Sequence, residues 1–352
     1  MSKSVKAFAP GRVNLIGEHT DYNEGLALPF AIGDGVTVTA APSSDDRIHV
    51  LAADLDARDS FAVTEPPPTR GWRAFARGVV SELGRAGAGL VGTRLEIRGS
   101  VARGSGLSSS AALEVALCLA LLAVGDADVP DRLDLARICS RVENEWVGAS
   151  TGLLDQMASL YGERDRALQI DFRSLEVTPV KLDLGDYSLV TVDSGQRHAN
   201  AARGSDGGED GSGYNQRRRE CREACERLGI ASLRDATLEM AAGLPEPLAD
   251  RARHVICENE RVRETVRALS DCELERVGEL LNESHASLRD CFEVSTDAVE
   301  ATVRRLREAG AIGARIVGGG FGGNVLGLFR PGTHPPEDAL EVWPGPGAHL
   351  MN

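Results

Sequence analysis

Residues 104–111, GSGLSSSA, combine two glycines with three serines at the start of a long apolar run, 111–124. Glycine has no Cβ, so the backbone there can turn tightly and approach a ligand closely. Serine is favoured at a helix N-terminus, where several backbone N–H groups lack an intrahelical partner. A strand-like segment at 94–101 precedes the glycines. This order directs N–H groups to one point, which suits a phosphate, whereas an ordinary linker is the alternative.

This run differs from two common nucleotide-binding loops. No Gly-Lys-Ser/Thr follows it, as a Walker A loop requires. Ser109 stands where the dinucleotide-binding fingerprint has its third glycine. The sequence therefore predicts a phosphate loop of another kind.

A second polar run lies near the start of the chain, at residues 11–22, GRVNLIGEHTDY. Its polar members are Arg12, Glu18, His19, Thr20, Asp21 and Tyr22. We predict a loop, because no helical or strand period separates the polar from the apolar side chains. The loop could hold a polyhydroxylated ligand or a metal, but Glu-His-x-Asp is not a recurring metal spacing. A solvated loop with an internal salt bridge is the alternative.

Two carboxylates stand in apolar surroundings. Glu143 lies within the apolar stripe of a predicted helix at 131–147, and Asp155 lies in the mostly apolar segment 148–162. A buried carboxylate is costly unless it is paired or liganded. Mg²⁺ would suit Glu143 together with a serine hydroxyl, with an ordinary helix-surface glutamate as the alternative. Asp155 is either a functional carboxylate or a helix cap.

Composition excludes several classes of protein. The chain has 352 residues, 42% of them hydrophobic, and a net charge of −14. An acidic chain is a poor nucleic-acid binder, because a polyanion requires a basic face. Seven scattered cysteines favour reduced thiols in the cytoplasm. We find neither a signal peptide nor an apolar run long enough to cross a membrane.

The elements that must position these loops alternate between strands and helices. Strands are expected at 5–9, 36–40, 47–52, 60–64, 94–101, 167–172, 187–193, 314–318, 325–329 and 340–343. Helices are expected at 72–85, 108–124, 131–147 and 215–228, and through most of 245–309. An acidic glycine-rich insert at 203–213 is expected to be flexible. A glycine loop at 318–323, GGGFGG, is either a hairpin turn or a backbone that something approaches closely.

The loops at 11–22, 104–111 and 318–323, in this order, resemble the three motifs of the GHMP small-molecule kinases. The first is similar to the galactokinase signature of that family, and the likeness covers about residues 5–330. Further matches are at 143–148, 152–156, 214–218 and 284–290. The resemblance implies a two-lobed α+β fold, with a ribosomal-S5-like N-terminal lobe at 1–185 and a ferredoxin-like C-terminal lobe at 186–352. The active site would lie between the lobes.

The resemblance also implies a reaction, in which ATP phosphorylates the anomeric C1 hydroxyl of galactose to give galactose 1-phosphate and ADP. Catalysis would use Asp155 as base and Arg12 to stabilise charge. The sugar would contact Glu18, His19, Thr20, Asp21 and Tyr214. The ATP phosphates would bind at Gly104, Ser105, Gly106, Leu107, Ser108, Ser109 and Ser110. Mg²⁺ would be held by Ser110 and Glu143, and the loop at 318–323 would support the site.

Some features depart from the family pattern. The stretch from Ser194 to Tyr214 is longer because of the acidic insert, Asn324 replaces a usual cysteine, and the chain after Arg330 lacks a family helix. A kinase for galacturonate or N-acetylgalactosamine and a non-catalytic sugar sensor are therefore the alternatives. We expect a monomer or weak homodimer whose partners are the sugar and ATP, without nucleic acid or membrane.

Overall fold

The first lobe contains a six-stranded sheet, five strands of which come from residues 5–99 and the sixth from residues 349–351. The computed structural model describes residues 4–100, 107–149, 151–196 and 213–351. The strands follow the order β13-β1-β3-β6-β4-β5, and β4 and β6 run parallel while the other neighbours are antiparallel. They are β1 (Val5–Asn14), β3 (Pro29–Pro42), β4 (Arg47–Ala52), β5 (Ala57–Ala62), β6 (Thr93–Gly99) and β13 (His349–Met351).

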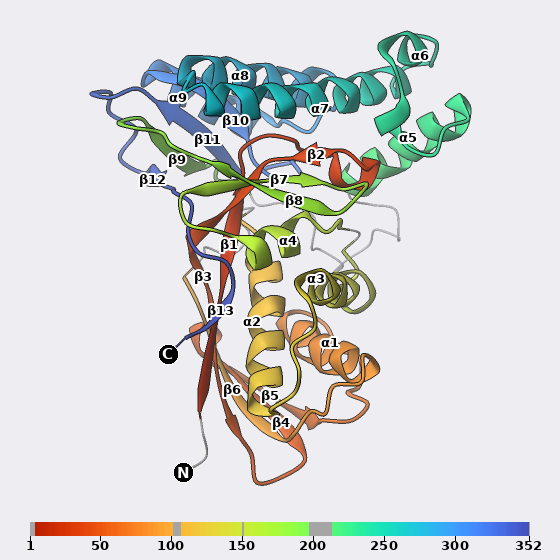
Figure 1. Ribbon diagram of the computed structural model, residues 1–352, viewed down its shortest axis with the longest axis vertical. Coiled ribbons are helices and arrows are strands. Elements are labelled where there is room, and N and C mark those ends of the chain that lie inside the picture. The colour runs from red at the N-terminus through yellow and green to blue at the C-terminus, as the bar shows by residue number, and fades with distance from the viewer. Residues whose placement is uncertain (1–3, 101–106, 150, 197–212, 352) are drawn as a thin grey trace.

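Four helices cover one face of this sheet. They are α1 (Trp72–Arg85), α2 (Ser109–Val124), α3 (Arg132–Arg141) and α4 (Leu154–Tyr161). Helix α2 is apolar on all sides, so it is buried, and it packs on β1 and β3 while α1, α3 and α4 surround it (Figure 1). The N-terminus of α2, which carries the three serines, consequently points toward the second lobe (Figure 1).

A four-stranded sheet forms the second lobe, in the order β10-β11-β9-β12. Its strands are β9 (Ser188–Asp193), β10 (Ala311–Ile316), β11 (Asn324–Phe329) and β12 (Leu340–Glu341). Helices α7 (Leu248–Ser270), α8 (Leu274–Asp290) and α9 (Asp297–Glu308) lie along it, and α5 (Gly213–Leu228) and α6 (Leu238–Ala242) lie at one end (Figure 1). The expected two-lobed α+β fold is confirmed.

Between the lobes lies a small sheet of β2 (Leu26–Ala27), β7 (Arg166–Asp171) and β8 (Glu176–Lys181). The expected division between residues 185 and 186 falls in the turn from β8 to β9. After β12 the chain returns to the first lobe, where β13 pairs with β1. The last residues therefore belong to the N-terminal sheet, and β12 covers the edge of β9.

Two local predictions were wrong. The segment 11–22 was expected to be all loop, but β1 continues to Asn14 because a bulge between Pro10 and Arg12 lets the strand resume its pairing with β3. A single helix was expected over 131–147, but α3 ends at Arg141 and a wider π-helical turn, Val142–Val147, follows. Such turns occur within helices and re-aim a side chain, in this case that of Glu143.

The described residues include no helix that is both long enough and apolar enough to cross a bilayer.

Alanine substitutions at two helical glycines should have opposite effects on stability. A Cβ on Gly278 of α8 would lie 2.8 Å from the Ile312 side chain and 3.1 Å from its backbone, whereas one on Gly84 of α1 would meet nothing within 4 Å. Gly278→Ala should therefore lower the free energy of unfolding by about 1–3 kcal/mol. Gly84→Ala should raise it by a few tenths, up to about 1 kcal/mol. Urea unfolding of both variants tests the pair, and equal effects would contradict the packing of α8 on β10.

Candidate active site

The centre of the site is a three-residue contact among Arg12, Ser108 and Asp155. Arg12, at the β1 bulge, directs Nε and Nη2 to Asp155 Oδ1 at 2.8 and 2.7 Å. Ser108 donates its hydroxyl to Asp155 Oδ2 at 2.5 Å. The three residues come from a strand, a loop and a helix that are far apart in sequence, and the predicted convergence of Arg12, Asp155 and the serine loop is observed.

Asp155 is in the first turn of α4 rather than at its cap, so the capping alternative does not hold. Helix α4 is fixed to β1 by the Ser159 hydroxyl, which donates to the carbonyl of Pro10 at 2.8 Å. This bond is one turn beyond Asp155 and next to Arg12. The two charged side chains are consequently brought together by backbone elements that are themselves tied.

Ser110 and Glu143 form the second contact. Ser110, in the first turn of α2, donates its hydroxyl to Glu143 Oε1 at 2.8 Å. The other carboxylate oxygen accepts from Thr151 at 2.8 Å and from the Gln156 amide at 2.9 Å. Burial, followed by the charge of Asp155, raises the pKa of Glu143 despite these donors. A cation beside this carboxylate would offset that cost.

Glu18 is buried and faces the second lobe. Its Oε1 accepts from the N–H of Gly318 at 2.7 Å and lies 3.2 Å from Nη2 of Arg315. Burial raises the pKa of Glu18, while the charges of Arg315 and Arg12 oppose that rise. The glycine loop 318–323 thus contributes a backbone donor to the site, which agrees with its predicted supporting role.

That glycine loop is approached closely on another side too. A Cβ on Gly320, where φ is +81°, would lie 2.5 Å from the Cβ of Val294, and one on Gly322 would lie 2.4 Å from the Gln196 carbonyl oxygen. No larger residue fits at these positions without a shift. Both interpretations of GGGFGG hold, because the loop is the hairpin connection between β10 and β11 and other segments also approach its backbone closely.

An aromatic group surrounds His19. Its Nδ1 is 2.8 Å from the Tyr22 hydroxyl, and its ring lies 5.3 Å from Tyr214 and 4.8 Å from Phe292 between centroids. Burial, helped by the nearby His254, lowers the pKa of His19 to about 3. The imidazole is therefore neutral near pH 7, and can exchange hydrogen bonds without carrying a charge.

Asp21 begins the 3-10 turn Asp21–Asn23 and lies against the segment that leads into α4. A Cβ on Gly152 would come within 1.9 Å of Asp21 Oδ2, so only glycine leaves room for this carboxylate. Burial raises the pKa of Asp21 to about 6, although a backbone hydrogen bond and Arg218 oppose it. The carboxylate is thus mostly ionised above that pH.

Other predicted site residues have different surroundings. The Thr20 hydroxyl lies 2.9 Å from the Gly17 carbonyl and 2.8 Å from that of Leu26, so it braces its own loop. Ser109 begins α2, and the carbonyl of Leu107 accepts from the Arg12 N–H at 3.1 Å.

Of the predicted phosphate-binding residues, positions 104, 105 and 106 lie outside the described residues, as does most of the 203–213 insert. Ser108, although placed as an N-cap, makes no capping bond.

No group of three or more His, Cys, Asp and Glu side chains that could hold a metal occurs in the described parts of the chain. A Ser110–Glu143 pair is smaller than such a group. Mg²⁺ in kinases needs only one or two protein ligands, however, because substrate phosphates and water complete its shell.

Sequence reasoning missed the residues that support the site from the C-terminal lobe. Arg315, fully buried in β10, was read only as part of a strand. The face of α7 that carries His254, Glu258 and Asn259 was read as part of an ordinary charged helix. The signal was present for His254 and Glu258, because residues four apart share a helix face, and buried polar side chains require partners.

Three family models match the chain. They are the galactokinase galactose-binding signature at residues 2–42, the GHMP kinases N terminal domain at 74–163, and the GHMP kinases C terminal model at 221–345. These matches include the segments that carry Arg12, Glu18 and Asp155.

Individual relatives agree. The galactokinase of Mycobacterium tuberculosis is 43% identical over 96% of this chain and 91% of its own length. That of Actinobacillus succinogenes is 39% identical over 97% and 88%. Among solved structures, Lactococcus lactis galactokinase complexed with galactose has a TM-score of 0.90 and 31% identity, covering 99% of this chain and 95% of its own.

The buried histidines behind the site predict a native state that is sensitive to acid. Burial lowers the pKa of His254 to about 4, against about 6.5 in an unfolded chain. Below about pH 6.5 the unfolded state therefore binds a proton that the native state does not, and the free energy of unfolding falls as the pH drops. Replacing His254 with Asn should reduce this slope by about 1 kcal/mol per pH unit between about pH 6 and 5. Urea unfolding across that range measures it, and an unchanged slope would contradict a buried neutral imidazole.

Proposed function

The chain belongs to the galactokinases of the GHMP kinase family, and we propose that it transfers a phosphoryl group from ATP to the anomeric C1 hydroxyl of galactose, using Asp155 as base. The observation that carries this proposal is the contact of Asp155 with both Arg12 and Ser108. The carboxylate of Asp155, the guanidinium of Arg12 and the hydroxyl of Ser108 therefore meet at the place where the sugar hydroxyl and the phosphate would react.

Galactose would lie against the acidic turn, residues 17–26, which follows β1. Glu18 and Asp21 supply carboxylate oxygens, His19 supplies a neutral imidazole, and Tyr214 adds a phenol beside His19. Such groups accept and donate several hydrogen bonds over a short distance, as a sugar with many hydroxyls requires. Thr20 contributes by fixing the loop backbone rather than by contacting the sugar.

Asp155 would accept the proton of the C1 hydroxyl as that oxygen attacks phosphorus. A hydroxyl is a poor nucleophile at neutral pH, so a carboxylate within hydrogen-bond reach is useful. One oxygen of Asp155 is held by Arg12 and the other by Ser108, which fixes the orientation of the carboxylate. Arg12 would also offset negative charge as the phosphoryl group passes, since phosphoryl transfer depends mainly on positioning and electrostatics.

The ATP phosphates would bind along residues 104–110, at the N-terminus of α2. The first turn of that helix presents backbone N–H groups and the positive end of its dipole. Ser110 and Glu143 fit Mg²⁺, because both offer oxygen, and because burial and the charge of Asp155 raise the pKa of the glutamate, a cost that a cation would offset. When bound, the ion would neutralise charge on the phosphate oxygens.

The galactose signature and the galactokinase relatives support galactose over the alternatives. Neither galacturonate, nor N-acetylgalactosamine, nor a non-catalytic sensor has a comparable observation in its favour. The contact of Asp155 with Arg12 supports phosphoryl transfer, which a non-catalytic sensor would not require.

A coupled ADP assay over free sugars tests the function. Galactose should give the fastest ADP release, with galacturonate, N-acetylgalactosamine and glucose at least about tenfold lower in kcat/KM. The Asp155→Asn variant, which keeps the shape of the side chain but is a far weaker base, should lose about 10²–10⁴ in kcat while still binding galactose. Near-normal turnover by this variant would refute the assigned base, and no ADP from wild type with galactose would refute the function.

Gly152 predicts a specific loss of galactose affinity. In Gly152→Ala the new methyl group occupies the place of the Asp21 carboxylate, which must rotate away. KM for galactose should rise roughly tenfold, since a charge-assisted hydrogen bond is lost, while KM for ATP stays within about twofold. Gly33→Ala is the matched control, because a Cβ there meets nothing within 4 Å. If both variants give the wild-type KM for galactose, Asp21 is not a sugar contact.

A further inference from the structure

The backbone of the acidic turn, residues 17–26, is held by side chains of helix α7 in the other lobe. Glu258 accepts from the Gly17 N–H at 3.0 Å, and Asn259 accepts from the Leu26 N–H at 2.7 Å. These two bonds therefore fix the two ends of the turn. Both bonds are buried, so water does not compete for them.

His254 on α7 contacts the middle of the turn, with Nε2 3.1 Å from the carbonyl oxygen of Glu18. This third contact from α7 falls directly behind the residue whose carboxylate faces Gly318. The main chain of Glu18 is thus fixed on one side while its side chain is used on the other.

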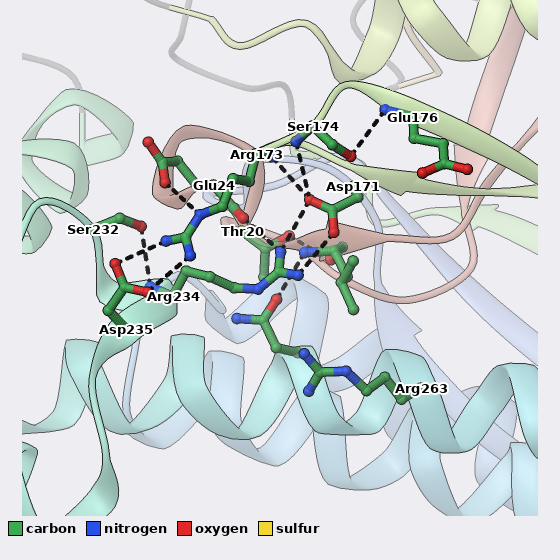
Figure 2. Close-up of polar contacts among 12 residues, drawn as sticks. Thr20, Glu24, Asp171, Arg173, Ser174, Glu176, Ser232, Arg234, Asp235 and Arg263 are labelled. Carbon is green, nitrogen blue, oxygen red and sulfur yellow. Dashed lines mark hydrogen bonds and ion pairs between the residues drawn. The ribbon is translucent and has the colours of Figure 1, made fainter.

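A second group of contacts comes from the 3-10 turn Leu233–Asp235 and the residue before it. The Ser232 hydroxyl donates to the carbonyl of Asn23 at 2.6 Å, and Arg234 Nη1 donates to that of Glu24 at 2.7 Å. Figure 2 shows Ser232 next to Arg234, whose side chain extends toward Asp171. They hold two successive carbonyls just after Asp21.

These side chains are themselves held in place. Glu258 accepts from Ser284 at 2.7 Å and from Arg261 Nε at 2.7 Å. Burial alone would raise its pKa, but Arg261 and the other basic groups nearby, together with the Ser284 hydrogen bond, lower it to about 2. Arg234 is anchored by Asp171, whose Oδ2 lies 2.8 Å from Nη2 (Figure 2). Pre-positioned partners hold a loop at less entropic cost than mobile ones do.

We propose that His254, Glu258, Asn259, Ser232 and Arg234 are positioning residues for sugar binding, which fix the main chain of the acidic turn from the C-terminal lobe. This inference rests on the proposed function, because it takes residues 17–26 as the sugar-binding loop. All five contact main-chain groups of the turn, so these contacts do not occupy the side chains of Glu18, His19 and Asp21. The turn then costs less entropy to order when galactose binds.

The contacts of the five positioning residues differ from ion pairs that only hold the two lobes together. The exposed Arg173 also crosses between them, but its partners are the carboxylates of Glu24 and Asp235 (Figure 2). Exposed pairs of this kind contribute little to stability. The five positioning residues instead bond successive backbone groups of one turn, which sets the conformation of that turn as well as joining the lobes.

Arg234→Ala tests the proposal, with Arg263→Ala as the matched control. Both arginines line the same cavity beside α7, but Arg263 pairs with Glu260 on its own helix rather than with the turn. Arg234→Ala should raise KM for galactose about tenfold and weaken galactose binding in calorimetry equally, with kcat and KM for ATP within about twofold. Arg234→Lys, which keeps a cationic donor, should recover part of the loss.

Hydrogen exchange gives a readout that does not need turnover. Amides of residues 17–26 should exchange faster in Arg234→Ala and at the wild-type rate in Arg263→Ala. If Arg234→Ala matches Arg263→Ala in exchange and in galactose affinity while wild type is active, the positioning role alone is refuted. A parallel rise in KM for galactose and for ATP would refute it as well, since that indicates general loosening. If wild type neither binds nor phosphorylates galactose, the proposed function fails and this inference fails with it.

Discussion

The arrangement of the two lobes depends on one buried guanidinium, that of Arg315. It is fully buried in the C-terminal sheet and donates to the carbonyls of Asn14 and Leu15, at the end of β1, at 3.0 and 2.8 Å. It also lies 3.2 Å from the Glu18 carboxylate. A buried charge that loses its partner costs about 3–5 kcal/mol, so the end of β1 and the acidic turn have little freedom to move away from β10. The start of the acidic turn is therefore fixed against the C-terminal sheet.

The chemistry depends on two irregularities close to that anchor. The bulge in β1 turns Arg12 toward α4, and the wide turn after α3 directs Glu143 toward Ser110. A regular strand and a regular helix would have placed these side chains elsewhere. Both deviations lie beside the proposed reaction centre, which agrees with the frequent use of bulges and π-turns at functional sites.

The sequence singled out the residues of the proposed site better than the elements that carry them. Arg12, Ser108 and Asp155 stood out because polar groups in glycine loops and isolated carboxylates in apolar segments need a reason, and the resemblance to the kinase family implied their roles. The bulge at Pro10 and the π-turn at Val142 could not be predicted from the sequence, since each depends on contacts with distant elements that override local periodicity. The stripe on α7 was missed for a related reason. Its period matches that of a surface helix with charge pairs, and only burial distinguishes the two.

The residues of the proposed site act through different parts of the chain, and this explains why some form a recognisable sequence motif and others do not. In the proposed site, Glu18, His19 and Asp21 would face the sugar with their side chains, so their identities are fixed together within four positions, and a local motif results. Glu258, Asn259 and Arg234 instead contact peptide groups, which every residue except proline offers in full. Contacts of this kind place no demand on the sequence of the turn, and their own spacing is set by the geometry of α7 and the turn at 233–235. Positioning from a second lobe therefore leaves no compact motif, although the conformation of the first motif depends on it.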